Sequence, residues 1–508
     1  MKICLQFSSE QNATHRRRLE YAFRVFCAVY GNTPLLGIEH ASTADISICY
    51  GPAEFAHGAR AVVRLSNLYR PRLPVEPAPP PNNYRDYGES TALIYAPLPG
   101  QTPDWLGEIF EWLSCADEYS VRERDSWQRV PFNTSYVGRH LLDGRIPYAA
   151  TAMRILNLTI CQALGRNVTQ PPSPSSSVKH FVIPTHDIDY FPVGRTNGLH
   201  RLLKNAAVSL VSSKDPALAI RQIGKALQFA LGKRNPMDQI QALSSLEQHK
   251  GVTASYYFLP RCVHPRDANY SLETPGVIGT LRSLTSAGME IGVHGTYSCL
   301  ERAGGLADEY RLARAAGFPA TGGRQHWLRF TLDRLISSLE SAGACYDTSL
   351  GWADRVGYRG GACFAFPPYN FEQERAANFL EIPMIVMDVA LRDQGSRAET
   401  WYSETTRVLS ASRRLGWGGI SLLWHPTAFG GGWLAPEAGE VFSRLLTERS
   451  QHGEAWLSAR DFLKAVRQRY ADAGLMPHEA EFAESEASPS RPNTSVDTPE
   501  FLEPSRIA

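Results

Sequence analysis

The sequence has 508 residues, with 52 Lys and Arg against 51 Asp and Glu and with 43% hydrophobic residues. At roughly 100–200 residues per domain, this length predicts two or three domains that each bury a core. A net charge of +1 excludes, for the chain as a whole, the excess of cations that binding to nucleic acid phosphates requires. No stretch reaches the roughly 18 consecutive apolar residues of a membrane span and no signal peptide is recognisable, so we expect a cytoplasmic protein.

The first 167 residues mix helical and strand patterns and contain no recognisable catalytic group of residues. Apolar residues recur at helical spacing over 18–30, and residues 46–50 have the pattern of a short strand. We therefore predict a small α+β accessory domain over 1–167. The following segment, 168–178, is rich in Pro and Ser, which is typical of a linker.

From Lys179 onward, short apolar runs alternate with helical patterns. This alternation favours a parallel (β/α) barrel of a deformed seven-stranded type over 179–475, although the pattern alone leaves an open doubly wound sheet possible. An acidic, Ser- and Pro-rich stretch over 476–508 predicts a disordered tail. The predicted strands are residues 179–185, 252–259, 289–294, 319–325, 344–349, 381–389 and 418–424.

Two helices of this barrel have clear sequence boundaries. The first is predicted over 236–249, with Asn235 and Pro236 as its N-cap and first residue. The second is predicted over 328–342 and ended by Gly343.

Residues 195–234 form a basic insertion in the predicted barrel. After Asp215 and Pro216, which are able to start a helix, Ile220, Ile223, Leu227 and Leu231 share one helical face. Such a segment suits an anionic membrane surface or an acidic glycan. A solvated helix packed on the barrel is the simpler interpretation, because the apolar stripe is narrow. The Lys and Arg residues of the insertion are 195, 201, 204, 214, 221, 225, 233 and 234, against Asp215 as its one acid.

Several predicted strands end in side chains that are able to catalyse hydrolysis. The first strand runs into Asp187 and Asp189, which point to the same face because side chains alternate along a strand. The C-terminal ends of barrel strands meet at one rim, and Asp and His together suit Zn²⁺ or a similar divalent ion. The other candidates at strand ends are His294, Arg324, His326, Asp347 and His425.

The order and spacing of these motifs resemble the polysaccharide deacetylase family, the metal-dependent carbohydrate esterases with a NodB homology domain. Five motifs carry the resemblance, together with a loop at 357–367 (GYRGGACFAFP) that is similar to a bacterial subgroup with THDxD and RQHxLRF motifs and an additional N-terminal domain. The five motifs are THDID (185–189), IGVHGTYS (291–298), GGRQHWLRF (322–330), YDTSLGW (346–352) and SLLWHPT (421–427).

This resemblance implies a role for each of the candidates. Asp187 would be the catalytic base, with Arg324 orienting it, and His425 would be the general acid. Asp347, or as second choice Asp388, would be the carboxylate that tunes this acid. Asp189 and His294 would bind a divalent metal, which is expected to be Zn²⁺.

One position departs from the family pattern. The second metal-binding histidine of the family stands four residues after the first, where this sequence has Ser298. His326 is the preferred substitute because it lies two residues past Arg324 and so on the same face. His186 is the second choice. The alternatives to a substitute ligand are that the site holds the metal weakly or that it has lost activity.

Aromatic residues in the same motifs are candidates for sugar binding. We expect two or three of seven to reach a cleft, because flat apolar rings suit the C–H faces of sugars, and we select Trp327, Trp352, Tyr358 and Trp424 as substrate contacts. The other three are Phe364, Phe366 and Tyr369.

The expected function is hydrolysis of the N-acetyl group of a sugar or polysaccharide by metal-activated water, with an N-acetylated glycan as partner and no nucleic acid. Two alternatives stay open. One is a glycan-binding protein with a decayed metal site, and the other is a hydrolase of small cyclic amides or ureides. Peripheral membrane contact through 195–234 is a further expectation.

Overall fold

The computed structural model describes residues 1–8, 11–51, 61–74, 76–95, 97–167, 170–192, 194–211, 216–393, 398–429 and 437–477. Within 170–178, the described part of the predicted linker, there is neither helix nor strand. Residues 168–169, the proposed helix start Asp215 and nearly all of the predicted tail over 476–508 lie outside the described residues.

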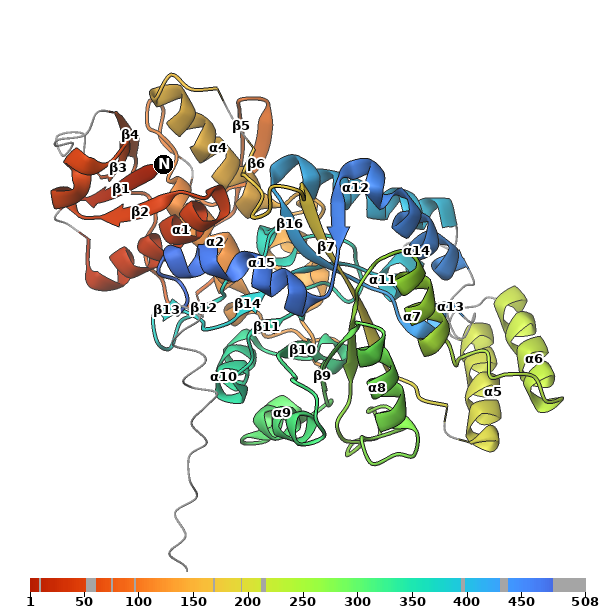
Figure 1. Ribbon diagram of the computed structural model, residues 1–508. Coiled ribbons are helices and arrows are strands. Elements are labelled where there is room, and N and C mark those ends of the chain that lie inside the picture. The colour runs from red at the N-terminus through yellow and green to blue at the C-terminus, as the bar shows by residue number, and fades with distance from the viewer. Residues whose placement is uncertain are drawn as a thin grey trace, which may run out of the picture.

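The N-terminal part contains a four-stranded parallel sheet in the order β2-β1-β3-β4, seen at the red end of the chain in Figure 1. Helix α1 begins where Asn12 accepts a hydrogen bond from the amide of His15 and ends at Gly31, whose φ of 63° suits glycine. The predicted mixture of helices and strands is confirmed. The elements are β1 (Lys2–Phe7), α1 (Ala13–Tyr30), β2 (Thr33–Leu36), β3 (Ile46–Tyr50), β4 (Val62–Leu65), the antiparallel pair β5 (Asn82–Asp86) and β6 (Glu89–Leu93), α2 (Trp105–Ser114), α3 (Tyr136–Arg139) and α4 (Tyr148–Ala163).

A second, larger sheet forms the centre of the molecule. Its strands follow the order β14-β11-β10-β9-β8-β7-β16-β15, with β17 pairing β7 as well, and all these pairs are parallel. Every one of the seven predicted strands is present here. The strands are β7 (His180–Ile188), β8 (Ser255–Phe258), β9 (Glu290–Gly295), β10 (Gly322–Gln325), β11 (Tyr346–Asp347), β14 (Leu380–Glu381), β15 (Met384–Met387), β16 (Gly418–Leu423) and β17 (Glu454–Trp456).

The two ends of this sheet belong to one short chain segment. Strands β14 and β15 stand at opposite ends of the strand order but are separated in the sequence by only Ile382 and Pro383. The amide of Ile382 donates to the carbonyl of Asp347 in β11, while the carbonyl of Pro383 accepts from the amide of Ser421 in β16. One extended segment therefore closes the sheet, which confirms the deformed (β/α) barrel and excludes the open sheet.

Helices surround the barrel, and two of them begin later than predicted. Helix α7 begins at Ile240 because Asn235 caps a turn instead, accepting from the amide of Met237. Helix α10 begins at Leu332 because Trp327 and Leu328 are left-handed, with φ of 63° and 52°, and it ends at Gly343 as predicted. The helices are α5 (Arg195–Val211), α6 (Pro216–Ala230), α7 (Ile240–His249), α8 (Val277–Ser286), α9 (Gly305–Ala315), α10 (Leu332–Ala342), α11 (Asp388–Asp393), α12 (Ala398–Leu415), α13 (Pro426–Phe429), α14 (Glu437–Glu448) and α15 (Ala459–Asp472).

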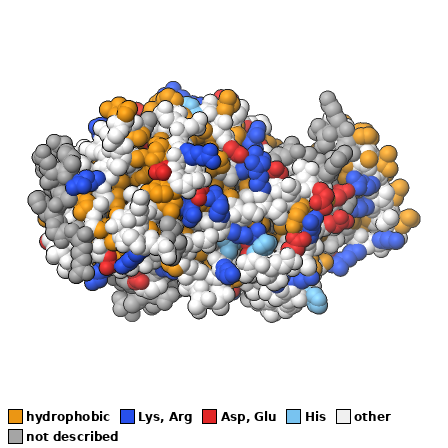
Figure 2. Space-filling model, turned by 90° about the horizontal axis from the view of Figure 1, so that it is seen from above, with side chains coloured by type: hydrophobic (Ala, Val, Ile, Leu, Met, Phe, Trp, Pro, Cys, Tyr) orange, Lys and Arg blue, Asp and Glu red, His pale blue; other side chains and the backbone are white. Residues whose placement is uncertain are grey.

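The basic insertion folds as the helical hairpin α5–α6, which projects at one end of the barrel (Figure 1). The apolar stripe expected on its second helix is present, but all four of its residues are exposed to solvent. The hairpin packs through another face of α6 instead, where Leu218, Ala226 and Phe229 are buried. Hydrophobic and basic side chains lie next to each other on the surface at this end (Figure 2).

The N-terminal part and the barrel share a continuous hydrophobic core. The indole of Trp417 donates to the carbonyl of Val29 at 3.0 Å, and the hydroxyl of Tyr21 donates to the carbonyl of Pro367 at 2.7 Å. The boundary of an accessory domain at 167 stays a prediction.

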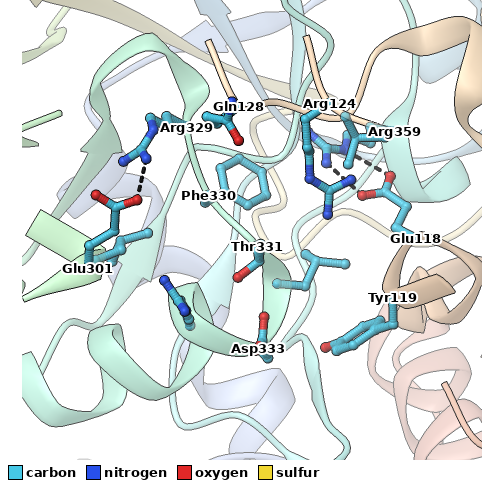
Figure 3. A pocket seen from close by; sticks show the side chains of 14 residues that line it. Glu118, Tyr119, Arg124, Gln128, Glu301, Arg329, Phe330, Thr331, Asp333 and Arg359 are labelled. Atoms are coloured by element: carbon cyan, nitrogen blue, oxygen red, sulfur yellow. Dashed lines mark hydrogen bonds and ion pairs between the residues drawn. The ribbon is translucent and has the colours of Figure 1, made fainter. Parts of the chain in front are cut away.

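A buried ion pair links the two parts. The guanidinium of Arg359 donates to both carboxylate oxygens of Glu118, at 2.9 and 2.6 Å, and both residues are buried. Figure 3 shows this pair at the edge of a cleft of about 470 Å³ between the two parts. This bidentate geometry is the strongest form of an ion pair, but only while both partners are present.

We expect Glu118→Gln to lower the free energy of unfolding by about 3–5 kcal/mol, because it leaves the buried Arg359 cation without its counter-charge. Urea denaturation followed by circular dichroism measures this change. Asp308→Asn is the matched control, since its ion pair with Arg311 is exposed and we expect an effect within about 1 kcal/mol. Equal effects of the two substitutions would contradict the interpretation.

Candidate active site

Strand β7 places two carboxylates at the C-terminal rim of the barrel. Asp187 and Asp189 face the interior, as the alternation of side chains predicts. His186, between them, points to the other face, where its Nε2 lies 2.7 Å from Glu247 on α7 and is fully buried. The second choice for a third metal ligand, His186, is therefore wrong.

The register of β9 and β10 brings a histidine next to an arginine. His294 and Arg324 are direct partners in this pair of strands, preceded by Val293 and Gly323. A Cβ atom on Gly323 would lie 1.8 Å from the carbonyl oxygen of Val293, so the close approach of the two strands requires glycine at this position.

Three side chains converge at this rim. The Nε2 atom of His294 lies 3.0 Å from Nδ1 of His326 and 3.3 Å from Oδ1 of Asp189, and His326 Nδ1 lies 3.4 Å from the same carboxylate oxygen. Among the residues described by the structure, these three form a group that is able to hold a metal ion. The structure thus brings His326, the preferred substitute for a histidine at Ser298, to the other two predicted ligands.

The hydrogen bonds of the two histidines fix which ring nitrogens carry protons. His294 Nδ1 lies 3.0 Å from the carbonyl of Arg324, and His326 Nε2 lies 2.9 Å from the carbonyl of Arg266. A carbonyl oxygen only accepts, so in the neutral rings these nitrogens carry the hydrogens. The other nitrogen of each ring then presents a lone pair toward its neighbour and toward Asp189.

This arrangement of acceptors fits a divalent cation. The Oδ1 atom of Asp189 is buried and has no hydrogen-bond partner. When both imidazole rings are neutral, three acceptor atoms therefore face one another. Ligand atoms at about 2.0–2.1 Å from a tetrahedral Zn²⁺ lie roughly 3.3–3.4 Å apart, close to the separations found here. Two imidazole nitrogens and a carboxylate oxygen are ligands that Zn²⁺ commonly has in proteins. Backbone carbonyls orient both rings, as is usual for metal-binding histidines.

Asp187 lies beside this group and is held by Arg324. The Nη1 atom of Arg324 donates to Asp187 Oδ1 at 2.9 Å, while Asp187 Oδ2 lies 3.6 Å from His294 Nε2. Arg324 is fully buried, and its Nε donates to the carbonyl of Thr348 at 2.9 Å. One carboxylate oxygen is thus fixed and the other faces the three ligands.

His425 follows β16 and pairs with Asp388. Its Nδ1 lies 2.8 Å from Asp388 Oδ1, its backbone amide donates to the other oxygen at 2.8 Å, and its Nε2 lies 3.4 Å from Asp189 Oδ2. The expectation that Asp347 is the partner of His425 is wrong. Strand β15, which ends just before Asp388, neighbours β16, whereas Asp347 is in β11 and its side chain accepts from the amide and hydroxyl of Ser349.

Charges around His425 and Asp189 favour their ionised forms. Burial alone lowers the pKa of His425, but Asp388 and Asp189 outweigh it and hold that pKa well above its ordinary value. Burial likewise opposes ionisation of Asp189, but His326, His294 and His425 hold the pKa of this carboxyl well below its usual range. The rim therefore pairs a cationic acid with an anionic ligand.

The rim opens into a cleft of about 570 Å³. Of the four aromatic residues selected from the sequence, Trp327 lines this cleft and is 37% exposed. Trp352, Tyr358 and Trp424 are buried, so their selection as substrate contacts is wrong. Each packs in the hydrophobic core, as do the other three aromatics of the seven, Phe364, Phe366 and Tyr369.

The N-terminal part contributes to this cleft, which the sequence did not indicate. The ring of Trp127 stacks on Trp327 at 4.1 Å with an interplanar angle of 6°, and Arg129 also lines the cleft. The indole of Trp327 donates to the carbonyl of Arg266 at 3.0 Å. These contacts hold Trp327 in its left-handed conformation, which costs of order 1–3 kcal/mol for a residue other than glycine.

The second cleft, shown in Figure 3, is lined by other residues of the same two chain segments. Gln128 and Phe330 line it, whereas Trp127 and Trp327 line the first cleft. Four of its seven charged lining residues form ion pairs with one another, Arg359 with Glu118 and Arg329 with Glu301.

Comparison with known proteins gives distant structural similarities. No family model and no curated protein matches the sequence. Among solved structures, an allantoinase has 13% identity and a TM-score of 0.39, with 60% of this chain and 95% of that chain covered. A family 4 carbohydrate esterase from Streptomyces lividans, in complex with acetate, has 12% identity and a TM-score of 0.28 over 55% of this chain and 92% of its own. A peptidoglycan deacetylase from Bacillus subtilis has 10% identity and a TM-score of 0.29 over 62% of this chain and 100% of its own.

We expect the purified protein to bind about one Zn²⁺ per chain through three protein ligands, and His326→Ala to weaken this binding more than about tenfold, since loss of an outer-shell partner alone costs 10–100-fold. Metal content after dialysis, measured by mass spectrometry, and calorimetric titration check this. The matched control is His452→Ala, because His452 is exposed. Unchanged zinc binding by His326→Ala would contradict the assignment.

Proposed function

We propose that this protein is a metal-dependent hydrolase that removes the N-acetyl group from a sugar or polysaccharide. One observation carries the proposal. A carboxylate and an imidazole, each held by its own buried partner, lie within 3.6 Å of atoms of the three-residue ligand group. Amide hydrolysis needs such a base and such an acid around one carbonyl group.

The first proton transfer belongs to Asp187. A divalent cation held by Asp189, His294 and His326 would polarise the acetyl carbonyl and lower the pKa of water. Asp187 Oδ2 accepts a proton from the attacking water while Arg324 holds the other oxygen of this carboxylate. The hydroxyl group adds to the carbonyl carbon and forms a tetrahedral species.

The second proton transfer belongs to His425. Breaking the C–N bond requires a proton on the leaving nitrogen, and the Nε2 atom of His425 donates it. Asp388 holds Nδ1 of this ring and stabilises the imidazolium form before the transfer. The products are acetate and the free amine of the sugar, and the proton held by Asp187 is available to restore His425.

The shape of the cleft supports a sugar as substrate. A volume of about 570 Å³ accommodates more than a single acetyl group. Trp327, stacked on Trp127 and partly exposed, places an aromatic ring beside His326 of the ligand group, and such rings suit the C–H faces of sugars. Four of the five sequence motifs that resemble polysaccharide deacetylases contribute the ligands, the base and the acid, namely 185–189, 291–298, 322–330 and 421–427.

We expect the zinc-loaded protein to release acetate from N-acetylglucosamine oligomers, and Asp187→Asn to reduce kcat by about 10²–10⁴-fold, because this is the contribution of a positioned general base. An enzymatic acetate assay measures the rate. Asp308→Asn, which changes an exposed carboxylate on α9, is the matched control and keeps full activity.

Other outcomes of this assay support other functions. Zinc binding without acetate release, but with turnover of a small cyclic ureide, would replace the proposal by a ring-opening hydrolase. Binding of glycans with neither zinc nor turnover would indicate a glycan-binding protein.

The partner of the acid is tested separately. We expect Asp388→Asn to lower kcat and to move the alkaline limb of the pH profile to lower pH. Activity falls as pH rises through the pKa of the protonated His425, and removing the Asp388 charge lowers that pKa. Asp347→Asn is the matched control, because Asp347 contacts Ser349 rather than His425, and we expect its alkaline limb to stay in place. A shift in Asp347→Asn alone would reverse the assignment.

A further inference from the structure

The hairpin α5–α6 carries an uncovered apolar surface. Fifteen large hydrophobic side chains are exposed among the described residues, and eight of them lie between residues 203 and 231. The other seven are scattered over the rest of the chain. Clustering of this kind marks an interaction surface, whereas single exposed apolar residues are normal. The eight residues are Leu203, Val208, Leu210, Val211, Ile220, Ile223, Leu227 and Leu231.

The exposed apolar side of α6 is different from the side through which this helix packs. On α6, the exposed Ile220, Ile223 and Leu227 are spaced by three and four residues and so follow one side of the helix. A different side contacts α5, where the hydroxyl of Ser209 donates to the buried side chain of Gln222 at 3.1 Å. Among the described residues, the two helices thus pack against each other while this side of α6 stays exposed.

The same hairpin is strongly basic. Residues 195–234 contain eight Lys and Arg and one Asp. Among the side chains that the structure describes, Arg221 faces Glu437 at 3.7 Å and Arg234 faces Asp238 at 3.4 Å. The segment keeps a net positive charge after these pairs are counted. Figure 2 shows basic side chains beside hydrophobic ones at this end of the molecule.

We propose that the hairpin α5–α6 docks on an anionic lipid bilayer. Exposed Ile and Leu side chains enter the headgroup region, and Lys and Arg contact lipid phosphates, which is how a basic amphipathic helix lies on a membrane. A second copy of the chain is a poorer occupant, because a symmetric contact would bring two basic segments together. No described helix is both long and apolar enough to traverse a bilayer, so this contact is peripheral.

The docking surface adjoins the candidate active site. Helix α5 also supplies Arg201, Lys204 and Val208 to the wall of the 570 Å³ cleft. A protein bound through this hairpin holds its cleft near the lipid surface. Resting on the proposed function, this position selects glycans anchored in the same membrane as the substrate class.

Vesicle sedimentation of the full chain tests the docking. We expect binding to phosphatidylcholine vesicles that contain phosphatidylglycerol, weaker binding at high salt, and little binding to phosphatidylcholine alone. The double variant Ile220→Asp/Leu227→Asp should bind the anionic vesicles at least about tenfold more weakly. Leu98→Asp/Leu141→Asp is the matched control, since it makes the same chemical change at exposed leucines elsewhere (66% and 93% exposed), and it should bind within about twofold of the unchanged protein.

Three results would overturn the docking proposal. The first is no binding of the unchanged protein to anionic vesicles, and the second is equal loss in both double variants. The third is a dimer in sedimentation velocity that only the hairpin variant dissociates, which identifies a second copy as the occupant. Acetate release from a soluble oligomer, measured in parallel, should be retained by the hairpin variant, and its absence in all proteins would contradict the proposed function while leaving the vesicle result intact.

Discussion

Two imidazole lone pairs and one carboxylate oxygen face one another at 3.0–3.4 Å on the rim of the barrel. Acceptors this close repel unless a cation or a proton lies among them. Backbone carbonyls accept from the nitrogens on the far sides of both rings, so in neutral rings the repulsion is relieved only by a cation or a further proton. Strands β7, β9 and β10 hold these three acceptors at the same rim.

Arg324 is the part of that arrangement that links the barrel interior to the rim. Its guanidinium is fully buried and requires a counter-charge, which Asp187 supplies at 2.9 Å. The backbone of Arg324 meanwhile orients His294 through its carbonyl. One residue therefore contacts both the proposed base and a proposed ligand, and closure of the barrel at Ile382 and Pro383 holds the strands in place around it.

Much of this architecture is readable from the sequence, for identifiable reasons. Seven short apolar runs alternating with helices predict the barrel, and polar residues at the ends of those runs predict which side chains share a rim. The pattern does not tell which strands are neighbours across the closure. It therefore gives no ground to correct the resemblance, which ranks Asp347 ahead of Asp388, whereas the structure has Asp388 beside His425. The strand pattern also does not separate aromatic residues that line the cleft from those that pack in the core. Trp327 and Trp352 both stand in motifs that carry the family resemblance, but of these two residues only Trp327 lines the cleft.

The stacking of Trp127 on Trp327 links the stability of a barrel loop to the presence of the N-terminal part. Trp327 and Leu328 adopt a backbone conformation that is costly without support, and part of that support comes from a residue roughly two hundred positions earlier. A barrel that lost the N-terminal part would retain the unfavourable conformational free energy of this loop without the stabilising contact from Trp127. We therefore expect related proteins that have this left-handed loop also to have the N-terminal part, because selection acts on the two together.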